Sequence, residues 1–299
     1  MGKEIKARIQ DRGIIDMPEE IPNFFIQQHF DMALKHFKYT IINASFSDYT
    51  KSYEAYKRTQ NIIKYFKNQI IKKKPLVKIV DIGCGNGHYI FLLNWLFKLN
   101  NKAHFYGVDL SSLDIYFAEA LKKSLNMDNI TFEVGDAENL RLPDNSFDFV
   151  ICSELIEHIV QPENCLKEIK RILKPGGLAI IATPNKNNAI RKISRIFNFL
   201  LKYKKENPIV TDSDTVIYYG TGHGHISVKS ISEWVKIIKT HGFIIEGIKR
   251  GSLIAGGPKF NTHPILFSAI LILDRLFDYL PFTLNFTEGI VFKLRKPPY

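Results

Sequence analysis

Cysteine is scarce in this chain of 299 residues, and the spacing of the few cysteines excludes two kinds of small-domain architecture. Cys84, Cys152 and Cys165 are odd in number and form no Cys-x-x-Cys pair. A disulfide framework needs paired cysteines, and a structural zinc site takes closely spaced ligands. We therefore expect neither a disulfide framework nor a resident metal, and we expect a reducing compartment.

Long apolar runs are also missing. A membrane-spanning helix needs about 20 predominantly apolar residues. The longest apolar run, 265–273, is about half that length and contains Ser268. The first six residues are mixed in charge and lack the apolar core of a signal peptide. We expect a cytoplasmic protein, with peripheral attachment to the inner face of the membrane as the second possibility.

Acidic residues are the minority among the charges. The chain has 41 Lys and Arg against 30 Asp and Glu, which makes its formal net charge +11. This excess fits an anionic partner such as a nucleic acid, a membrane surface or an acidic substrate. It fits a solvated basic surface equally well, so charge alone does not select a function.

What the chain does contain is a regular alternation of strand-like and helix-like segments. The predicted strands are 76–82, 104–109, 130–134, 147–152, 178–182, 243–249 and 289–295. The predicted helices between them are 87–99, 112–124, 162–173 and 228–241. Lys174-Pro175-Gly176-Gly177 is predicted to stop the third of these helices. Such alternation is typical of a parallel, doubly wound α/β sheet.

A glycine-rich stretch follows the first predicted strand. Gly83, Gly85 and Gly87 alternate there and lead into a predicted helix. Glycines let the backbone turn sharply and let a ligand approach it, and a helix N-terminus offers free N–H groups to an anion. Glycine-rich turns also serve as plain strand-to-helix connections, so the residues that follow must decide between the two.

Acidic and polar residues follow the ends of the first four predicted strands, where ligands of doubly wound sheets bind. Asp109 is placed to accept from ribose hydroxyls, and Asp136 from an exocyclic amine such as that of adenine. Dehydrogenases that bind nicotinamide dinucleotides have an acidic residue at the same distance in sequence after their glycine loop. The loop here, however, is Gly-x-Gly-x-Gly, whereas the dinucleotide motif is Gly-x-Gly-x-x-Gly.

Taken together, these motifs resemble the class I S-adenosylmethionine-dependent methyltransferases, in the group that includes ubiquinone and menaquinone methylating enzymes. The motifs that carry the resemblance are 80–87, 106–109, 135–140 with Pro143, 147–150, Glu157-His158 and 173–177. The resemblance implies a seven-stranded, mostly parallel, Rossmann-like sheet of order 3-2-1-4-5-7-6, with strand seven antiparallel. It also implies S-adenosylmethionine as the cofactor.

The resemblance assigns parts of the cofactor to individual residues. Gly83 to Gly87 would lie against its methionine part and Asp81 would hold its amino group. Asp109 would bind the ribose, and Asp136 with the Ala137 amide would bind the adenine. The expected cofactor-binding set is Asp81, Gly83, Cys84, Gly85, Gly87, Asp109, Leu110, Asp136, Ala137, Glu138, Ser153 and Glu154.

Methyl transfer from a sulfonium is an in-line displacement that needs alignment more than a protein nucleophile. If the acceptor is a hydroxyl, which we expect, a general base helps. The candidates are His158, His223 and His225. His158 is otherwise a polar residue of a turn. The His-Gly-His pair has no evident acidic or cysteine partner and is expected in a substrate loop.

The chain is expected to divide into a helical segment, 1–75, and a methyltransferase domain, 76–299, with insertions at 186–225 and 251–286. Helical patterns at 23–39 and 50–72 either pack on the sheet edge or form a lid. In the first insertion, 190–205 is amphipathic and basic, and the second is strongly apolar. The insertions form a lid or contact an anionic membrane, and they suggest a small-molecule or lipid-linked acceptor.

Two other functions compete with this hypothesis. RNA methylation fits the positive charge, but no Asn-Pro-Pro-Tyr type of motif follows the fourth predicted strand, so a nucleic-acid acceptor is less favoured. A non-catalytic, cofactor-binding protein of the membrane surface would leave the acidic residues at four strand ends without a purpose. The sequence does not indicate the oligomeric state.

Overall fold

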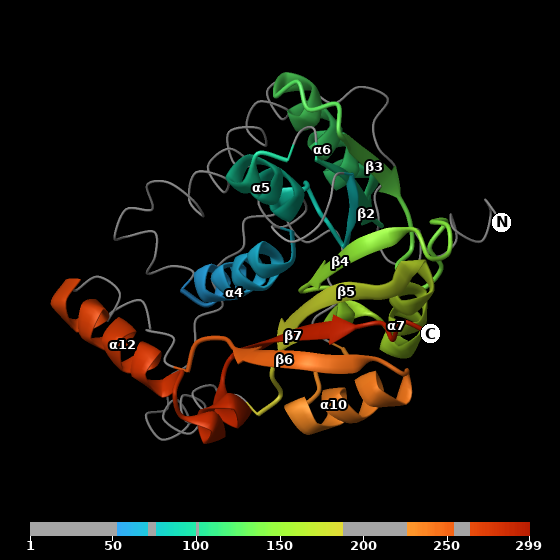
Figure 1. The fold of residues 1–299 in the computed structure, drawn as a ribbon. Coiled ribbons are helices and arrows are strands. Elements are labelled where there is room, and N and C mark those ends of the chain that lie inside the picture. The colour runs from blue at the N-terminus through green and yellow to red at the C-terminus, as the bar shows by residue number, and fades with distance from the viewer. Residues whose placement is uncertain (1–52, 71–75, 100–101, 188–225, 254–263) are drawn as a thin grey trace.

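The computed structural model describes residues 53–70, 76–99, 102–187, 226–253 and 264–299. Within them, one seven-stranded sheet has the order β3-β2-β1-β4-β5-β7-β6 (Figure 1). Its strands are β1 Val77–Ile82, β2 Ala103–Asp109, β3 Ile130–Val134, β4 Phe147–Ser153, β5 Leu173–Pro184, β6 Ile244–Arg250 and β7 Gly289–Arg295. Strands β1 to β5 are parallel, and β7 is antiparallel to both of its neighbours. The predicted fold class and strand order are confirmed.

Helices cover both faces of the sheet and create two apolar cores (Figure 1). One core is formed by α4 Tyr53–Ile70, α5 His88–Phe97 and α6 Ser112–Ser124. The other is formed by α7 Pro162–Ile172 and α10 Ile231–Thr240, with the short helix η1 Ile156–His158. Central strands such as β4 are buried on both faces, which explains the unbroken apolar run from Phe149 to Cys152.

The helix boundaries follow from local chemistry. The Ser111 hydroxyl accepts a hydrogen bond from the Asp114 amide and caps α6, which has the bounds predicted for it. Helix α10 begins at Ile231, three residues later than predicted. Ser230 and Glu233 form a capping box there, and each satisfies a backbone amide of the other.

One predicted strand boundary is wrong. Helix α7 ends at Ile172, as the Lys174–Gly177 stop predicts, but β5 starts at Leu173 and includes this segment, whereas the predicted strand starts at 178. The Gly176 amide donates to the Lys296 carbonyl, and the Lys296 amide donates to the Gly177 carbonyl. Gly176 has φ +74°, which glycine adopts readily, so the strand can pair at this irregular point. The partner lies 120 residues away and leaves no local signal.

The second insertion contains α12 Pro264–Phe277 and η2 Pro281–Phe286, and α12 extends away from the sheet (Figure 1). The predicted helices at 23–39 and 190–205, together with His223 and His225, lie outside the described residues. None of the helices within the described ranges combines the length and apolar character needed to cross a bilayer.

Helix α4 shares the core of the sheet. Ile62 and Phe66 are fully buried. The Phe66 ring lies 5.6 Å from that of Phe97 on α5 and 5.5 Å from that of Phe149 on β4, measured between centroids. Burial of this kind makes α4 part of the folded unit.

We expect Phe66→Ala to lower the free energy of unfolding by about 3–5 kcal/mol, because it removes a buried ring and leaves a cavity. Urea denaturation followed by circular dichroism measures this loss. Lys67→Ala, an exposed position on the same helix, is the control and should change the value by less than about 0.5 kcal/mol. Equal effects of the two substitutions would contradict the packing of α4 on the sheet.

Candidate functional site

The site lies where the strand order reverses. Strand β1 pairs with β2 on one side and β4 on the other, so their following loops diverge at the carboxyl ends. The amides of Gly83 and Cys84 donate to the Val108 carbonyl, at 2.8 Å and 3.1 Å. The Gly135 amide donates to the Asp109 carbonyl at 2.9 Å. These bonds bring the ends of β1, β2 and β3 together.

The glycine loop needs glycine for two different reasons. Gly83, Gly85 and Gly87 all have positive φ, between +50° and +83°. A Cβ on Gly87 would lie 2.8 Å from the rings of Phe91 and Phe132, so that glycine is required by packing. A Cβ on Gly85 would meet nothing within 4 Å, so space lies open over the middle of the loop.

Asp109 at the end of β2 supports this loop. Its Oδ2 accepts from the Gly85 amide at 2.7 Å, and its Oδ1 accepts from the Ser111 amide at 2.8 Å. Burial raises the pKa of Asp109 to about 6, although the amides of Ser111, Gly85 and Leu110 oppose that rise. The structure thus places Asp109 and Leu110 directly beside the loop.

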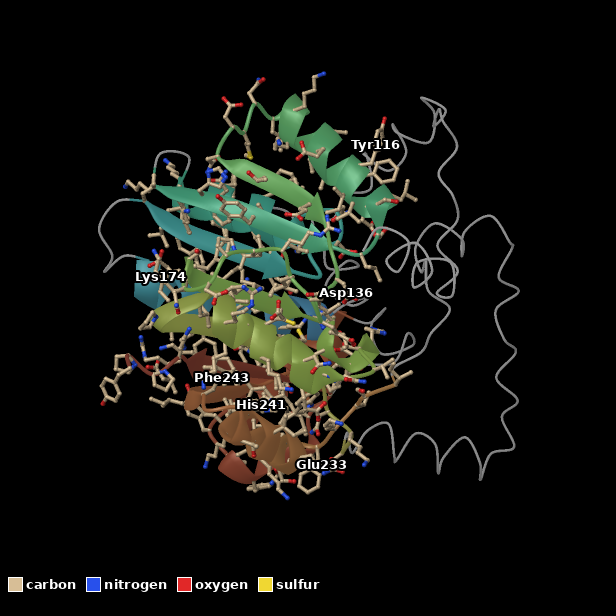
Figure 2. The ribbon with its side chains drawn as sticks, turned by 90° about the vertical axis from the view of Figure 1, so that its right-hand side faces the viewer. Tyr116, Asp136, Lys174, Glu233, His241 and Phe243 are labelled. Atoms are coloured by element: carbon tan, nitrogen blue, oxygen red, sulfur yellow. The ribbon has the colours of Figure 1, made fainter. Side chains whose placement is uncertain are left out.

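Asp136 lies in the turn after β3, at the opposite end of the sheet from Lys174 (Figure 2). Its Oδ1 accepts from the Glu138 amide at 2.9 Å, and its carbonyl accepts from the Asn139 amide. The Glu138 carboxylate accepts from the Gln161 amide at 3.3 Å, and Ala137 packs against the core. Side-chain bonding of this kind holds the turn in one shape.

Asp81 is the unusual residue of the site. It is 1% exposed, and neither carboxylate oxygen has a hydrogen-bond partner among the described residues. Burial raises the pKa of Asp81 well above its ordinary range, and the charge of Asp109 adds to the rise. A buried carboxyl without partners costs stability, so a cationic ligand group is the natural complement to this position.

Strand β4 ends in residues that face α4 and α5. The Ser153 hydroxyl donates to the Tyr89 hydroxyl at 3.3 Å. Glu154 has φ +54°, which is strained for a residue with a side chain, and strain of this kind clusters at functional sites. Its carboxylate lies 2.8 Å from Arg58 Nη1 of α4. Arg58 was not predicted, because its partner lies far along the chain.

Glu157 and Thr183 also belong to this edge and were not predicted as site residues. Glu157 is fully buried, and its Oε2 accepts from the Thr183 hydroxyl at 3.1 Å. Its Oε1 lies 3.9 Å from His158 Nε2. Burial, followed by the charge of Glu154, raises the pKa of Glu157 to about 8. Thr183 is the second-last residue of β5, so applying the strand-end argument to a fifth strand would have found it.

The structure therefore gathers the predicted residues at one edge of the sheet, with two qualifications. Cys84 contributes backbone to the loop, while its side chain packs in the core. His158 has a side chain that is 36% exposed and stands beside Glu157, whereas the other two candidate histidines lie outside the described residues. Within the described ranges, no three His, Cys, Asp or Glu side chains are placed to hold a metal ion.

Known proteins resemble the chain over this region. Residues 73–207 match the model of a family described as a methyltransferase domain. A ubiquinone biosynthesis O-methyltransferase of Coxiella burnetii is 33% identical over 127 residues, which cover 42% of this chain and 50% of that protein. A demethylmenaquinone methyltransferase of Staphylococcus aureus is 26% identical over 147 residues, with 46% and 58% covered.

The chain thus spans about half the length of the curated relatives it matches. Among solved structures, the [4+2]-cyclase SpnF superposes with a TM-score of 0.51 at 17% identity, covering 80% of both chains. At that identity the likeness supports the fold alone, since one fold hosts different reactions. The resemblance drawn from the sequence motifs is confirmed.

The raised pKa of Glu157 predicts how the free energy of unfolding depends on pH. Its folded pKa of about 8 exceeds the ordinary value of 4.5, so between these pH values the folded chain holds a proton that the unfolded chain has released. The free energy of unfolding must therefore fall as pH rises through this window. In the parent, this fall amounts to up to about 1.4 kcal/mol per pH unit. We expect it to be absent in Glu157→Gln, whose side chain does not titrate.

Urea unfolding of the parent and of Glu157→Gln between pH 4.5 and pH 9 measures the difference. For the control that follows, the same measurements extend below pH 4.5, the ordinary pKa of glutamate. Glu233→Gln is a control of opposite sign, because hydrogen bonds from the Ser230 amide and hydroxyl lower the pKa of Glu233. The free energy of unfolding of Glu233→Gln should be lower than that of the parent at neutral pH. This difference should shrink as pH falls below 4.5. A constant difference between Glu157→Gln and the parent at every pH would refute the assignment.

Proposed function

We propose that the protein transfers a methyl group from S-adenosylmethionine to a small-molecule or lipid-linked acceptor, because residues 73–207 match a family described as a methyltransferase domain. In this proposal residues 76–299 form the catalytic domain and 1–75 cover it. The observation that carries the proposal is Asp81, a buried carboxyl whose oxygens have no partner among the described residues and which adjoins the glycine loop.

The residues at this edge fit the chemical groups of the cofactor one by one. The ammonium of its methionine part would neutralise Asp81, and its carboxylate suits the N-terminus of α5, which starts directly after Gly87. Asp109 would accept from the ribose hydroxyls, and Asp136 with the Ala137 amide would bind the adenine. The open space over Gly85 leaves room for the ligand beside the backbone.

The chain's own task in the reaction is alignment and proton removal. S-adenosylmethionine supplies an activated methyl group, so the site must hold the acceptor in line and exclude water. We propose His158 as the base that takes the proton of an acceptor hydroxyl, since imidazole accepts protons near neutral pH. Glu157 lies 3.9 Å from it and would orient the ring.

Two observations favour a quinone-like acceptor, and the name of the Coxiella burnetii relative, an O-methyltransferase, favours transfer to oxygen. The matched relatives are named for ubiquinone and demethylmenaquinone methylation. Helix α12 of the second insertion is also apolar, which suits a hydrophobic acceptor. The proposal includes an anionic membrane surface as a partner, with the protein cytoplasmic and peripheral. RNA methylation gains no support from the names of these relatives.

Replacing Asp81 should lower cofactor affinity without lowering thermal stability. We expect Asp81→Asn to weaken binding of S-adenosylmethionine by about 10- to 100-fold, because it removes a charge-assisted contact. Its melting temperature should equal or exceed that of the parent, because a buried carboxyl without partners is lost. Isothermal titration calorimetry and thermal unfolding measure the two effects.

Asp148→Asn is the matched control for this experiment. Asp148 is another buried aspartate, on the neighbouring strand β4, but it accepts from the Lys78 amide and pairs with Lys174 at the far end. This variant should lose about 1–3 kcal/mol of stability and keep its cofactor affinity. A parent protein that does not bind S-adenosylmethionine would overturn the proposed function.

Replacing His158 tests the acceptor atom. We expect His158→Gln to slow methyl transfer by about 100-fold or more and to leave cofactor affinity unchanged. Transfer of labelled methyl groups into quinone precursors and lipid extracts measures the rate. His241→Gln, on the far end of α10, is the control (Figure 2). Equal rates for both variants would exclude His158 as the base.

A further inference from the structure

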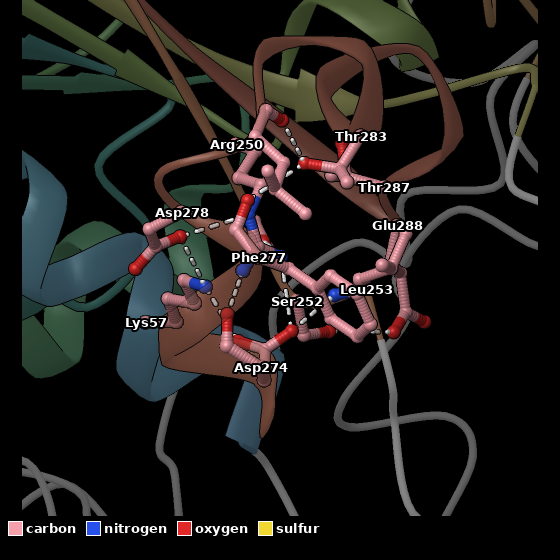
Figure 3. A network of polar contacts seen from close by, with 12 residues as sticks. Lys57, Arg250, Ser252, Leu253, Asp274, Phe277, Asp278, Thr283, Thr287 and Glu288 are labelled. Carbon is pink, nitrogen blue, oxygen red and sulfur yellow. Dashed lines mark hydrogen bonds and ion pairs between the residues drawn. The ribbon is translucent and has the colours of Figure 1, made fainter. Parts of the chain in front are cut away.

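Helix α12 is oriented with its acidic side toward the protein (Figure 3). Asp274 and Asp278 are four residues apart and therefore share one face of the helix. Lys57 Nζ of α4 contacts Asp274 Oδ2 at 2.5 Å and Asp278 Oδ1 at 2.9 Å. Arg250 at the end of β6 contacts the same two carboxylates, at 2.9 Å and 2.8 Å.

This cluster of two cations and two acids holds α12 in one rotation about its axis. Asp274 is fully buried, and Lys57 and Arg250 are less than 10% exposed. The Leu253 amide donates to Asp274 Oδ1 at 2.7 Å, which satisfies a further lone pair. Buried charges are tolerated only when they are paired and hydrogen-bonded, so rotating α12 outward would leave Lys57 and Arg250 unpaired.

The opposite side of α12 is apolar and faces outward. Ile272, Leu273 and Leu276 are 60%, 48% and 57% exposed. The exposed apolar surface continues past the helix end through Tyr279, Leu280, Phe282 and Phe286. A surface helix normally buries its apolar stripe and exposes its charges. Here the arrangement is reversed, and exposed large apolar side chains clustered along one segment are typical of an interaction site.

This surface stands at the edge of the sheet that carries the candidate site. Residue Gly289, which starts β7, pairs with Pro184 at the carboxyl end of β5. Arg250, which ends β6, pairs with Ile290 next to it. The segment between β6 and β7 therefore leaves and rejoins the sheet on the side of the glycine loop. The segment that carries α12 is therefore anchored at the same edge of the sheet as the candidate site.

The charge of the chain distinguishes two possible binding partners for this surface, an anionic membrane and a second copy of the chain. Residues 264–286 contain three charged residues, and both acids among them face Lys57 and Arg250. The third, Arg275, is exposed. With a net charge of +11, a second copy of the chain would be repelled, whereas an anionic surface attracts it. Aromatic residues such as Tyr279 and Phe282 suit the lipid–water boundary.

We propose that α12 and η2 dock on an anionic lipid bilayer, with Ile272, Leu273, Leu276 and the aromatic residues after them inserted at its surface. The membrane partner and the membrane-borne acceptor rest on the proposed function, but the choice of α12 and η2 as the docking surface does not. It follows from the reversed orientation of α12, which the cluster of Lys57, Arg250, Asp274 and Asp278 maintains.

Vesicle flotation of the full chain tests this proposal. The vesicles are phosphatidylcholine with or without 30% phosphatidylglycerol, a composition chosen for the experiment as roughly that of an anionic membrane. The parent should float with the anionic vesicles and less with the neutral ones. Ile272→Gln combined with Leu276→Gln should lower the partition coefficient at least about tenfold, because two inserted side chains are lost.

The control combines Leu76→Gln with Ile244→Gln. These residues are 66% and 49% exposed and lie at the opposite edge of the sheet, so the control should float like the parent. Calorimetry on the same samples should give all three proteins the same affinity for S-adenosylmethionine. Absent cofactor binding with intact flotation would overturn the proposed function and leave the docking surface standing.

Three results would overturn the docking surface. The first is a parent protein that does not bind anionic vesicles. The second is equal flotation of the parent and the Ile272→Gln, Leu276→Gln variant. The third is a parent dimer, found by light scattering without lipid, that the same variant converts to a monomer, because the occupant would then be a second copy of the chain.

Discussion

The candidate site depends on one backbone contact, in which the amides of Gly83 and Cys84 donate to the Val108 carbonyl. This contact turns the chain back over the end of β2 directly after the central strand, and only residues that tolerate positive φ can make the turn. Asp109 then reaches the Gly85 amide and holds the loop open. The acidic residues of neighbouring strands meet there because parallel strands end at the same edge.

The same edge concentrates groups that oppose folding. Asp81 is buried without hydrogen-bond partners among the described residues, burial raises the pKa of Glu157 to about 8, and Glu154 has a strained backbone. Such features lower the stability of a chain and persist where binding or catalysis needs them. The two apolar cores on either side of the sheet supply the stability that offsets them.

Helix α4 connects the candidate site with the proposed docking surface. Its adjacent residues Lys57 and Arg58 reach in different directions, one to the acids of α12 and the other to Glu154 at the end of β4. Ile62 and Phe66 fix the helix in the core, so both ion pairs start from a rigid support. The outward helix α12 and the edge of the sheet that carries the candidate site are thereby held in one rigid arrangement.

The sequence by itself determined the sheet, its order through the family resemblance, and most of the acidic strand-end residues, because periodicity and glycine spacing are local signals. It did not indicate Arg58, the role of Thr183 or the pairing of Gly176 with Lys296, whose partners lie 26 to 120 residues away. The composition of the second insertion predicted a hydrophobic segment, but it did not indicate which side of α12 faces outward. Only the tertiary structure decided that, because buried Lys57 and Arg250 require both aspartates as partners.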